Sequence, residues 1–173
     1  MGPGAARNEA SRAEHGVRLR TAIVVALLGV AGCAPAPPPP TVVNLQASAT
    51  ATVNATPQGQ GAPVAIRIYQ LASKAAFERA EFFPLYNTDA AALGPDLVKK
   101  DEFLLAPGSS KSVTLQPADT VRVIGVFAAY RDFQNATWRG DADIPAHQTT
   151  TVTITADRAG IKLVATSGKP ASP

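Results

Sequence analysis

Hydrophobic and polar residues alternate along much of the chain beyond residue 41. In VVNLQASATATV (42–53), Val43 begins a series of apolar or small residues at every second position, with mostly polar neighbours between them. VAIRIYQL (64–71) alternates in the same way, and TTTVTITA (149–156) alternates and is rich in β-branched residues. A period of two is typical of strands with one buried face. These segments therefore predict half-buried β-strands.

Further segments predict the remaining strands. TVRVIGVFAAY (120–130) is the most apolar run, which indicates a central strand covered on at least one face. EFLLA (102–106) and KSVTL (111–115) flank PGSS, and we expect them to form a hairpin with glycine in its short loop. GIKLV (160–164) predicts a last short strand.

Residues 73–100, SKAAFERAEFFPLYNTDAAALGPDLVKK, break the alternation. Ser73 is suited to cap a short helix, and Pro84 must end or interrupt it. Thr88 or Asp89 is suited to cap a second one. We therefore predict an all-β protein, an antiparallel β-sandwich with a small inserted helical element at 73–100.

The N-terminal segment is typical of an export signal. TAIVVALLGVA (21–31) is apolar but too short to span a bilayer, which takes about 20 apolar residues, and two arginines precede it. VAGC (30–33) resembles the bacterial lipobox, in which cleavage leaves the cysteine as an acylated N-terminus. Cys33 is the only cysteine of the chain, and an unpaired thiol would be a liability in an oxidising compartment. We predict a signal peptide at 1–32 and a covalent lipid on Cys33; the alternative is an ordinary signal peptide.

Residues 1–16 contain Glu9, Glu14 and His15, which are unusual ahead of an export signal. We hypothesise that translation starts at Val17 and that residues 1–16 are not translated. A peptide from residues 1–16 in a proteome digest would refute this hypothesis.

The segment after the lipidated cysteine predicts a spacer. APAPPPP (34–40) favours polyproline II at about 3.1 Å per residue, so the linker at 33–42 is expected to be a stiff spacer of roughly 20 Å. We expect the sandwich over 43–164 and a flexible, small and polar tail over 165–173. Ala34 stands where an aspartate tends to retain bacterial lipoproteins at the inner membrane. The resemblance therefore implies the outer membrane, with the domain facing the periplasm.

Removing the signal changes the charge of the protein. The chain has 16 basic and 13 acidic residues; four and two of them lie in residues 1–32, which leaves 12 and 11. The basicity belongs mostly to the signal, and we expect no nucleic-acid partner. The remaining length suffices for one domain with a hydrophobic core.

Catalytic chemistry finds little support in the sequence. His147 is the only histidine after the signal, no Ser or Cys motif flanks it, and we expect it to lie exposed in a loop. One histidine and one lipidated cysteine do not make a metal site. We predict a protein that is not an enzyme, binds no metal or small-molecule substrate, and has no cofactor besides the lipid on Cys33.

AAYRDFQNATWRG (128–140) is the most distinctive polar and aromatic segment. Arg131, Asp132, Trp138 and Arg139 are candidates for a recognition surface, since Trp and Arg are enriched at binding hot spots. In the alternative interpretation, which we favour, Trp138 plugs one end of the sandwich and an arginine pairs with a carboxylate or loop carbonyls.

A series of landmarks follows the lipobox cysteine. They are APVAIRIYQL (62–71), Phe77, LG (93–94) ahead of DL, DEFLLAPG (101–108), IGVFAAYRD (124–132) and WR (138–139). Their order resembles TssJ, the outer-membrane lipoprotein family of bacterial type VI secretion systems, over roughly residues 30–164. The resemblance implies a transthyretin-like β-sandwich with extra helical elements, in agreement with the strand pattern.

The resemblance also implies a structural role. Members of this family bind the periplasmic C-terminal domain of TssM, the inner-membrane component, through the loop between the first two strands. Here that loop is NATPQGQGAP (54–63), which departs from the commoner LNPD-like start, so individual contacts do not carry over. The expected partner-binding residues are Asn54, Thr56, Pro57, Gln58, Gly59, Gln60 and Gly61. Two other classes stay open: a periplasmic ligand- or carbohydrate-binding lipoprotein, and a hydrolase using His147.

Overall fold

Strand β1 (Val42–Ala49) opens the folded part of the chain. The computed structural model describes residues 37–170, and a compact unit begins at Pro38. Val43, Leu45 and Ala47 are buried, whereas the residues between them are exposed or half-buried. This alternation turns one face of the strand to a core, as predicted. The strand is shorter than its pattern, because the chain leaves the sheet after Ala49.

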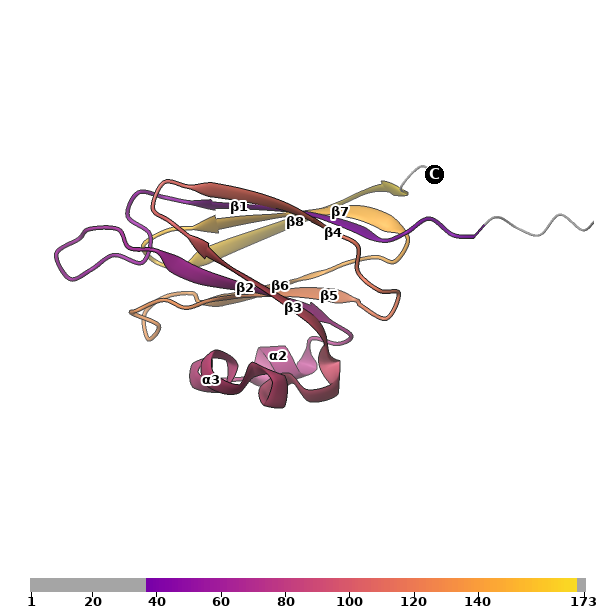
Figure 1. The fold of residues 1–173 in the computed structure, drawn as a ribbon, viewed down its shortest axis with the longest axis horizontal. Coiled ribbons are helices and arrows are strands. Elements are labelled where there is room, and N and C mark those ends of the chain that lie inside the picture. Colours follow the sequence, from indigo (N-terminus) through magenta and orange to yellow (C-terminus); the bar gives the residue numbers. More distant parts are fainter. Residues whose placement is uncertain (1–36, 171–173) are drawn as a thin grey trace, which may run out of the picture. The chain divides into compact units, whose positions relative to one another are not determined.

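The other elements follow in chain order. They are β2 (Val64–Leu71), α2 (Ala75–Arg79), α3 (Phe82–Leu93), the 3-10 helix η1 (Gly94–Asp96), β3 (Leu97–Leu105), β4 (Ser110–Leu115), β5 (Val123–Ala128), β6 (Arg139–Asp143), β7 (Gln148–Ala156) and β8 (Ile161–Pro170). The strands form two four-stranded sheets, β4-β1-β7-β8 and β3-β2-β5-β6. Helices α2 and α3 lie against the outer face of the second sheet (Figure 1). The predicted β-sandwich with a helical insertion is confirmed.

The strand pairs are antiparallel with one exception. β1 lies between β4, which runs antiparallel to it, and β7, which runs parallel to it, with Leu45 opposite Val113 and Val152. The pairs β2–β3, β2–β5, β5–β6 and β7–β8 are all antiparallel. A parallel pair needs a long crossover, which the intervening second sheet supplies.

Strand β2 is buried on both faces and shows how the layers are built. Val64, Ile66 and Ile68 face the other sheet and belong to the inter-sheet core. Tyr69 and Leu71 face the helices and belong to a second cluster. We call this second cluster the aromatic cluster; it comprises Tyr69, Leu71, Phe77, Phe82, Leu85, Leu93, Val123 and Phe127. β5 is likewise buried along its whole length, which explains why its segment is the most apolar run of the sequence.

The expected hairpin around PGSS is wrong. β3 pairs with β2 and β4 pairs with β1, so the two strands belong to different sheets. Gly108 has φ of 71° and donates its N–H to the carbonyl of Thr50, which fixes the crossing at the sandwich edge. A tight glycine turn indicates a reversal of the chain but not which strand each arm will pair with.

Two edge strands also differ from expectation. β6 (Arg139–Asp143) has no apolar alternation, and of its residues Ala142 alone is buried. The predicted flexible tail begins too early, because β8 continues to Pro170 and pairs Ala165 with Val152 and Thr166 with Thr151. β6 and the last part of β8 gain main-chain hydrogen bonds to a neighbouring strand without an alternation of buried apolar residues, so composition does not reveal them. The signal peptide, Cys33, residues 34–36 and residues 171–173 lie outside the described residues.

The helical insertion is shorter than residues 73–100, since β3 begins at Leu97. The predicted cap at Ser73 is wrong, because the N-cap of α2 is Lys74 and its side chain makes no capping hydrogen bond. The Ser73 hydroxyl, one residue earlier, accepts a hydrogen bond from the N–H of Ala75 (3.2 Å). Pro84 lies in the first turn of α3, where proline is tolerated. Thr88 has non-helical φ and ψ of −143° and 45°, which kinks α3 at the predicted second cap.

Candidate partner-binding surface

The loop between β1 and β2 leaves the sandwich at the end opposite to the start of β1 (Figure 1). Asn54 fixes the base of this loop. Its side-chain amide donates to the carbonyl of Pro63 (2.8 Å), and its side-chain oxygen accepts from the N–H of Arg131 (2.8 Å). Asn54 also has φ of 46°, a left-handed conformation that asparagine tolerates better than most residues. It is therefore an internal clamp that joins two loops.

The tip of the loop is a compact turn. The N–H of Thr56 donates to the carbonyl of Gln60 (2.7 Å), and the N–H of Gly59 donates back to the carbonyl of Thr56 (2.8 Å). Gly59 has φ of 83°, which glycine adopts at no steric cost. Gly61 is needed for another reason, because a Cβ there would lie 2.1 Å from the carbonyl oxygen of Ala51.

The predicted partner-binding residues differ in exposure and fall into three groups. Pro57, Gln58 and Gln60 are exposed at the tip. Asn54 is buried, and both polar atoms of its side chain are bonded within the chain, so it supports the tip from below. The other members, Thr56, Gly59 and Gly61, are half-buried, and the Thr56 hydroxyl is buried without a hydrogen-bond partner among the described residues. The exposed tip thus offers two amide side chains and a proline.

The loop between β5 and β6 lies beside this tip. A hollow of about 350 Å³ separates the two loops, lined by Asn54, Ala55, Thr56, Pro57, Tyr130, Arg131, Asp132 and Arg158. Arg131 and Asp132 are exposed there, and one carboxylate oxygen of Asp132 accepts from the side chain of Asn135 (2.9 Å). The two loops therefore form one surface at this end of the sandwich, joined through Asn54.

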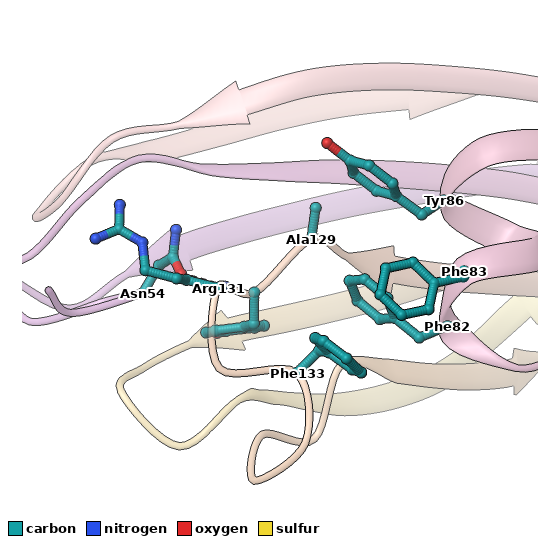
Figure 2. A pocket seen from close by; sticks show the side chains of 8 residues that line it. Asn54, Phe82, Phe83, Tyr86, Ala129, Arg131 and Phe133 are labelled. Carbon is teal, nitrogen blue, oxygen red and sulfur yellow. Dashed lines mark hydrogen bonds between the residues drawn. The ribbon is translucent and has the colours of Figure 1, made fainter. Parts of the chain in front are cut away.

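A second hollow, of about 390 Å³, continues this surface toward α3. Its lining is Asn54, Phe82, Phe83, Tyr86, Ala129, Tyr130, Arg131 and Phe133. Figure 2 shows the rings of α3 and Phe133 on one side, and Arg131 and Asn54 on the other. Reasoning from the sequence missed these rings, although the run FFPLY (82–86), with three aromatic residues around a proline, could have signalled them.

Trp138 and Arg139 lie deeper in the structure than Arg131 and Asp132. The Trp138 ring packs on Phe82 and Phe127, at centroid distances of 5.3 and 5.7 Å. The Arg139 guanidinium lies 4.9 Å from the Trp138 ring and donates to the carbonyls of Phe77 and Ala80 at the end of α2. These contacts favour the structural interpretation for both residues.

A charged network holds α3 on the second sheet. Asp89, on α3, accepts hydrogen bonds from the Lys100 ammonium (2.8 Å) and the Tyr69 hydroxyl (3.1 Å). The Arg67 guanidinium donates to the carbonyls of Leu85 (2.8 Å) and Tyr86 (2.9 Å) and pairs with Glu102 (2.8 Å).

The surroundings of Asp89 set its charge. Burial alone would raise the pKa of Asp89, but the hydrogen bonds from Lys100 and Tyr69 outweigh it and hold that pKa below its usual range. The Asp89 carboxylate is therefore charged and paired, as a buried acid must be. The network positions α3 and, with it, one wall of the second hollow. We call this wall the aromatic wall; it comprises the rings of Phe82, Phe83, Tyr86 and Phe133.

His147 lies in the turn before β7, a loop position as expected, but it is half-buried where we expected it to be exposed. Its N–H donates to the hydroxyl of Thr41 (2.9 Å), and its Nδ1 lies 2.9 Å from the carbonyl oxygen of Pro39. It thus fastens the segment that enters β1. Residues 37–170 contain no group of three or more His, Cys, Asp or Glu side chains that could hold a metal ion.

Comparison with known proteins identifies the fold. The solved T6SS lipoprotein TssJ1 from Pseudomonas aeruginosa is 39% identical with a TM-score of 0.71, and the match covers 78% of this chain and 100% of that one. Lip from Serratia marcescens, described as a membrane-bound component of the type VI secretion system, is 32% identical with a TM-score of 0.67, covering 71% and 96%. A chain of a structure described as a type VI membrane complex is 25% identical with a TM-score of 0.63, covering 71% and 97%. The comparison with curated proteins gives no match.

The match to a protein family spans both sheets and the insertion. The family described as Type VI secretion lipoprotein, VasD, EvfM, TssJ matches residues 41–159. Within residues 37–170, no helix is long and apolar enough to cross a membrane. The chain belongs to the TssJ family of type VI secretion lipoproteins.

Proposed function

We propose that this protein is a structural, non-catalytic lipoprotein that tethers the periplasmic C-terminal domain of TssM to the outer membrane. The tether would link the two membranes of the cell envelope in the type VI secretion membrane complex. The observation that carries the proposal is the family match over residues 41–159, which includes the β1–β2 loop with its exposed tip. The relatives described as a membrane-bound component and as part of a membrane complex support the same role.

The outer-membrane attachment rests on the lipid of Cys33. The folded unit begins at Pro38, a few residues beyond that cysteine, so lipidation leaves the core of the sandwich untouched. Each buried methylene of an acyl chain stabilises membrane attachment by roughly 0.8 kcal/mol, and several chains together resist a pulling partner. Ala34 in place of a retaining aspartate supports the outer membrane as the destination.

The exposed tip of the β1–β2 loop is the proposed contact with TssM. Gln58 and Gln60 present side-chain amides and no charge, so docking there desolvates no ion. The turn between Thr56 and Gln60 and the Asn54 clamp hold the tip in one shape before the partner arrives. A pre-organised loop loses less conformational entropy on binding than a flexible one.

A binding experiment tests the proposal. The Cys33→Ser chain is mixed with the cognate TssM periplasmic domain, and affinity is measured by calorimetry for the intact loop and for a chain lacking residues 57–61. We expect the deletion to weaken binding at least about 100-fold, which corresponds to the loss of a hot spot, with little change in thermal unfolding. Gln116→Ala, an exposed glutamine outside both loops, is the control and should bind like the parent. Absence of binding by the intact chain would refute the tether.

A further inference from the structure

Four aromatic rings follow one another along the wall of the second hollow. The centroid distances are 5.0 Å from Phe83 to Phe133, 4.4 Å from Phe133 to Phe82 and 5.8 Å from Phe82 to Tyr86. The two ends of this series are open to solvent, with Phe83 54% and Tyr86 47% exposed. Exposed aromatic side chains that gather around a hollow are typical of protein-binding surfaces.

The remaining exposed large hydrophobic residues of the described part do not gather in this way. Val98, Leu104 and Val164 lie on strands β3 and β8, and none of them lines either hollow. Scattered apolar side chains of this kind are normal on protein surfaces. The aromatic wall is therefore distinguished by its clustering as well as by its exposure.

Two cations lie at the other side of the hollows. Arg131 lines both of them, and Arg158 lines the one nearest the loop tip together with one carboxylate, Asp132, whose Oδ1 accepts from Asn135. Within residues 37–170 neither side chain has a salt bridge. The neighbouring Asp157 is already occupied, because its Oδ1 accepts from the N–H groups of Ala159 and Gly160. The guanidinium groups are thus available for an incoming carboxylate.

The point at which residues 38–41 enter the sandwich argues against a lipid surface as the occupant of the hollows. Residues 38–41 enter the sandwich at the start of β1, at the end opposite to the β1–β2 loop (Figure 1), whose residue Asn54 lines both hollows. β1 spans about 26 Å between these two ends at roughly 3.3 Å per residue. A membrane held at the start of β1 would lie away from the aromatic wall.

A second copy of this chain is also a poor occupant. A two-fold contact centred on the hollows would bring Arg131 and Arg158 of one copy toward the same residues of the other, with Asp132 as the only carboxylate per copy among the lining residues to offset two cations. Like charges facing each other across an interface are unfavourable. A protein segment that carries a carboxylate and a large apolar side chain fits this surface, because the carboxylate can pair with the arginines and the apolar side chain can pack on the aromatic rings.

We propose that the two hollows form one docking groove for an extended acidic segment of the partner protein. A large apolar side chain of that segment packs between Phe83, Tyr86 and Phe133, and a carboxylate of the same segment binds the Arg131 guanidinium. The groove begins at the base of the β1–β2 loop, since both hollows share Asn54, Tyr130 and Arg131. This inference rests on the proposed function, and it adds a second contact with defined chemistry beside the loop tip.

The test uses the Cys33→Ser chain and the cognate TssM periplasmic domain. Calorimetry is performed with Phe83→Ala and with Arg131→Glu, two substitutions at exposed positions, after thermal unfolding has shown that each variant is folded. We expect each variant to weaken binding at least about 10-fold. The difference in binding affinity between Arg131→Glu and the parent should become smaller as the salt concentration is raised, because salt screens the attraction between the Arg131 guanidinium and the partner carboxylate.

Matched controls separate this inference from the tether itself. Leu104→Ala removes another exposed apolar side chain, and Lys162→Glu reverses an exposed charge on β8; both should bind like the parent. Parent-like affinity of Phe83→Ala and Arg131→Glu, with binding still lost on deleting residues 57–61, would overturn the groove and leave the tether standing. Failure of the parent chain to bind would overturn both.

Discussion

The two packed clusters of this protein are built from different residues. Among its buried members the inter-sheet core has Tyr130 as its only aromatic side chain in the described part of the chain; the others are Val, Ile, Leu and Ala. The aromatic cluster under α2 and α3 includes Tyr69, Phe77, Phe82 and Phe127. Aliphatic side chains pack well between two regular sheets, whereas large rings fill the less regular space between a sheet and short helices.

The clusters also differ in what fixes them. The inter-sheet core is held by strand pairing on both sides. The aromatic cluster is bounded by helices of five and twelve residues, too short to be stable alone. Arg67, Asp89 and Lys100 tie down α3, and Arg139 ties down α2 through the carbonyls of Phe77 and Ala80. The fold therefore rests on the aliphatic core, and the proposed docking groove rests on the aromatic cluster. Substitutions in each cluster can test this division.

Phe77→Ala is expected to have the largest effect. Phe77 is fully buried, its ring centroid lies 5.8 Å from that of Tyr69, and its ring packs against Gly125, where an added Cβ would lie 3.2 Å from it, so truncation leaves a cavity between the second sheet and the helices. We expect Phe77→Ala to lower the free energy of unfolding by about 3–5 kcal/mol. For comparison, Ile154→Ala in the inter-sheet core should lower it by about 2–5 kcal/mol. Denaturant unfolding measures both. A loss below about 1 kcal/mol for Phe77→Ala would mean that the aromatic cluster is loosely packed.

Asp89→Asn is expected to lower the free energy of unfolding by about 2–3 kcal/mol at neutral pH. It leaves Lys100 and Arg67 without their shared carboxylate in a site where Asp89 is 11% exposed. The pKa of Asp89 is held below its usual range in the folded protein, since the hydrogen bonds from Lys100 and Tyr69 outweigh the effect of burial. Its contribution is therefore present above the ordinary aspartate pKa of about 4 and is lost as the pH falls below that value.

Unfolding measured from pH 7 to pH 3 checks both the size and the sign of the Asp89 effect. The difference in the free energy of unfolding between the parent and Asp89→Asn should become smaller as the pH is lowered. Glu102→Gln is the control, because Glu102 pairs with Arg67 but its side chain is 45% exposed, and the substitution should cost less than about 1 kcal/mol. If the difference in the free energy of unfolding between the parent and Asp89→Asn stays constant down to pH 3, the pKa of Asp89 is not lowered in the folded protein.

Features that depend on a local pattern could be predicted from the sequence, whereas contacts between distant segments could not. The period of two in residues 64–71 identified β2 and its inward residues, because each sheet face repeats every second residue. The helical insertion was visible as a break in that period. The role of Asp89 was not, since its partner Tyr69 lies twenty residues away in sequence and meets it only after α3 folds back onto β2.

The candidate site was predictable only in part. Its loop was located by resemblance, and Pro57, Gln58 and Gln60 are indeed exposed. Asn54 looked like a contact residue, but its internal bonds to Pro63 and Arg131 depend on the approach of two loops. The aromatic wall escaped notice for the same reason, because Phe133 joins Phe82 from a loop that nothing in the local pattern places there.

A pair of hydroxyl deletions gives the smallest expected effects and the sharpest comparison of the two clusters. Tyr130 donates to the neutral carbonyl of Asp157 (2.9 Å), whereas Tyr69 donates to the charged carboxylate of Asp89 (3.1 Å). Tyr130→Phe should therefore cost about 1 kcal/mol and Tyr69→Phe about 2 kcal/mol, because hydrogen bonds to charged groups are worth more. Denaturant unfolding at pH 7 compares them directly. Equal losses would show that the charge of Asp89 adds nothing to the strength of its hydrogen bond with Tyr69.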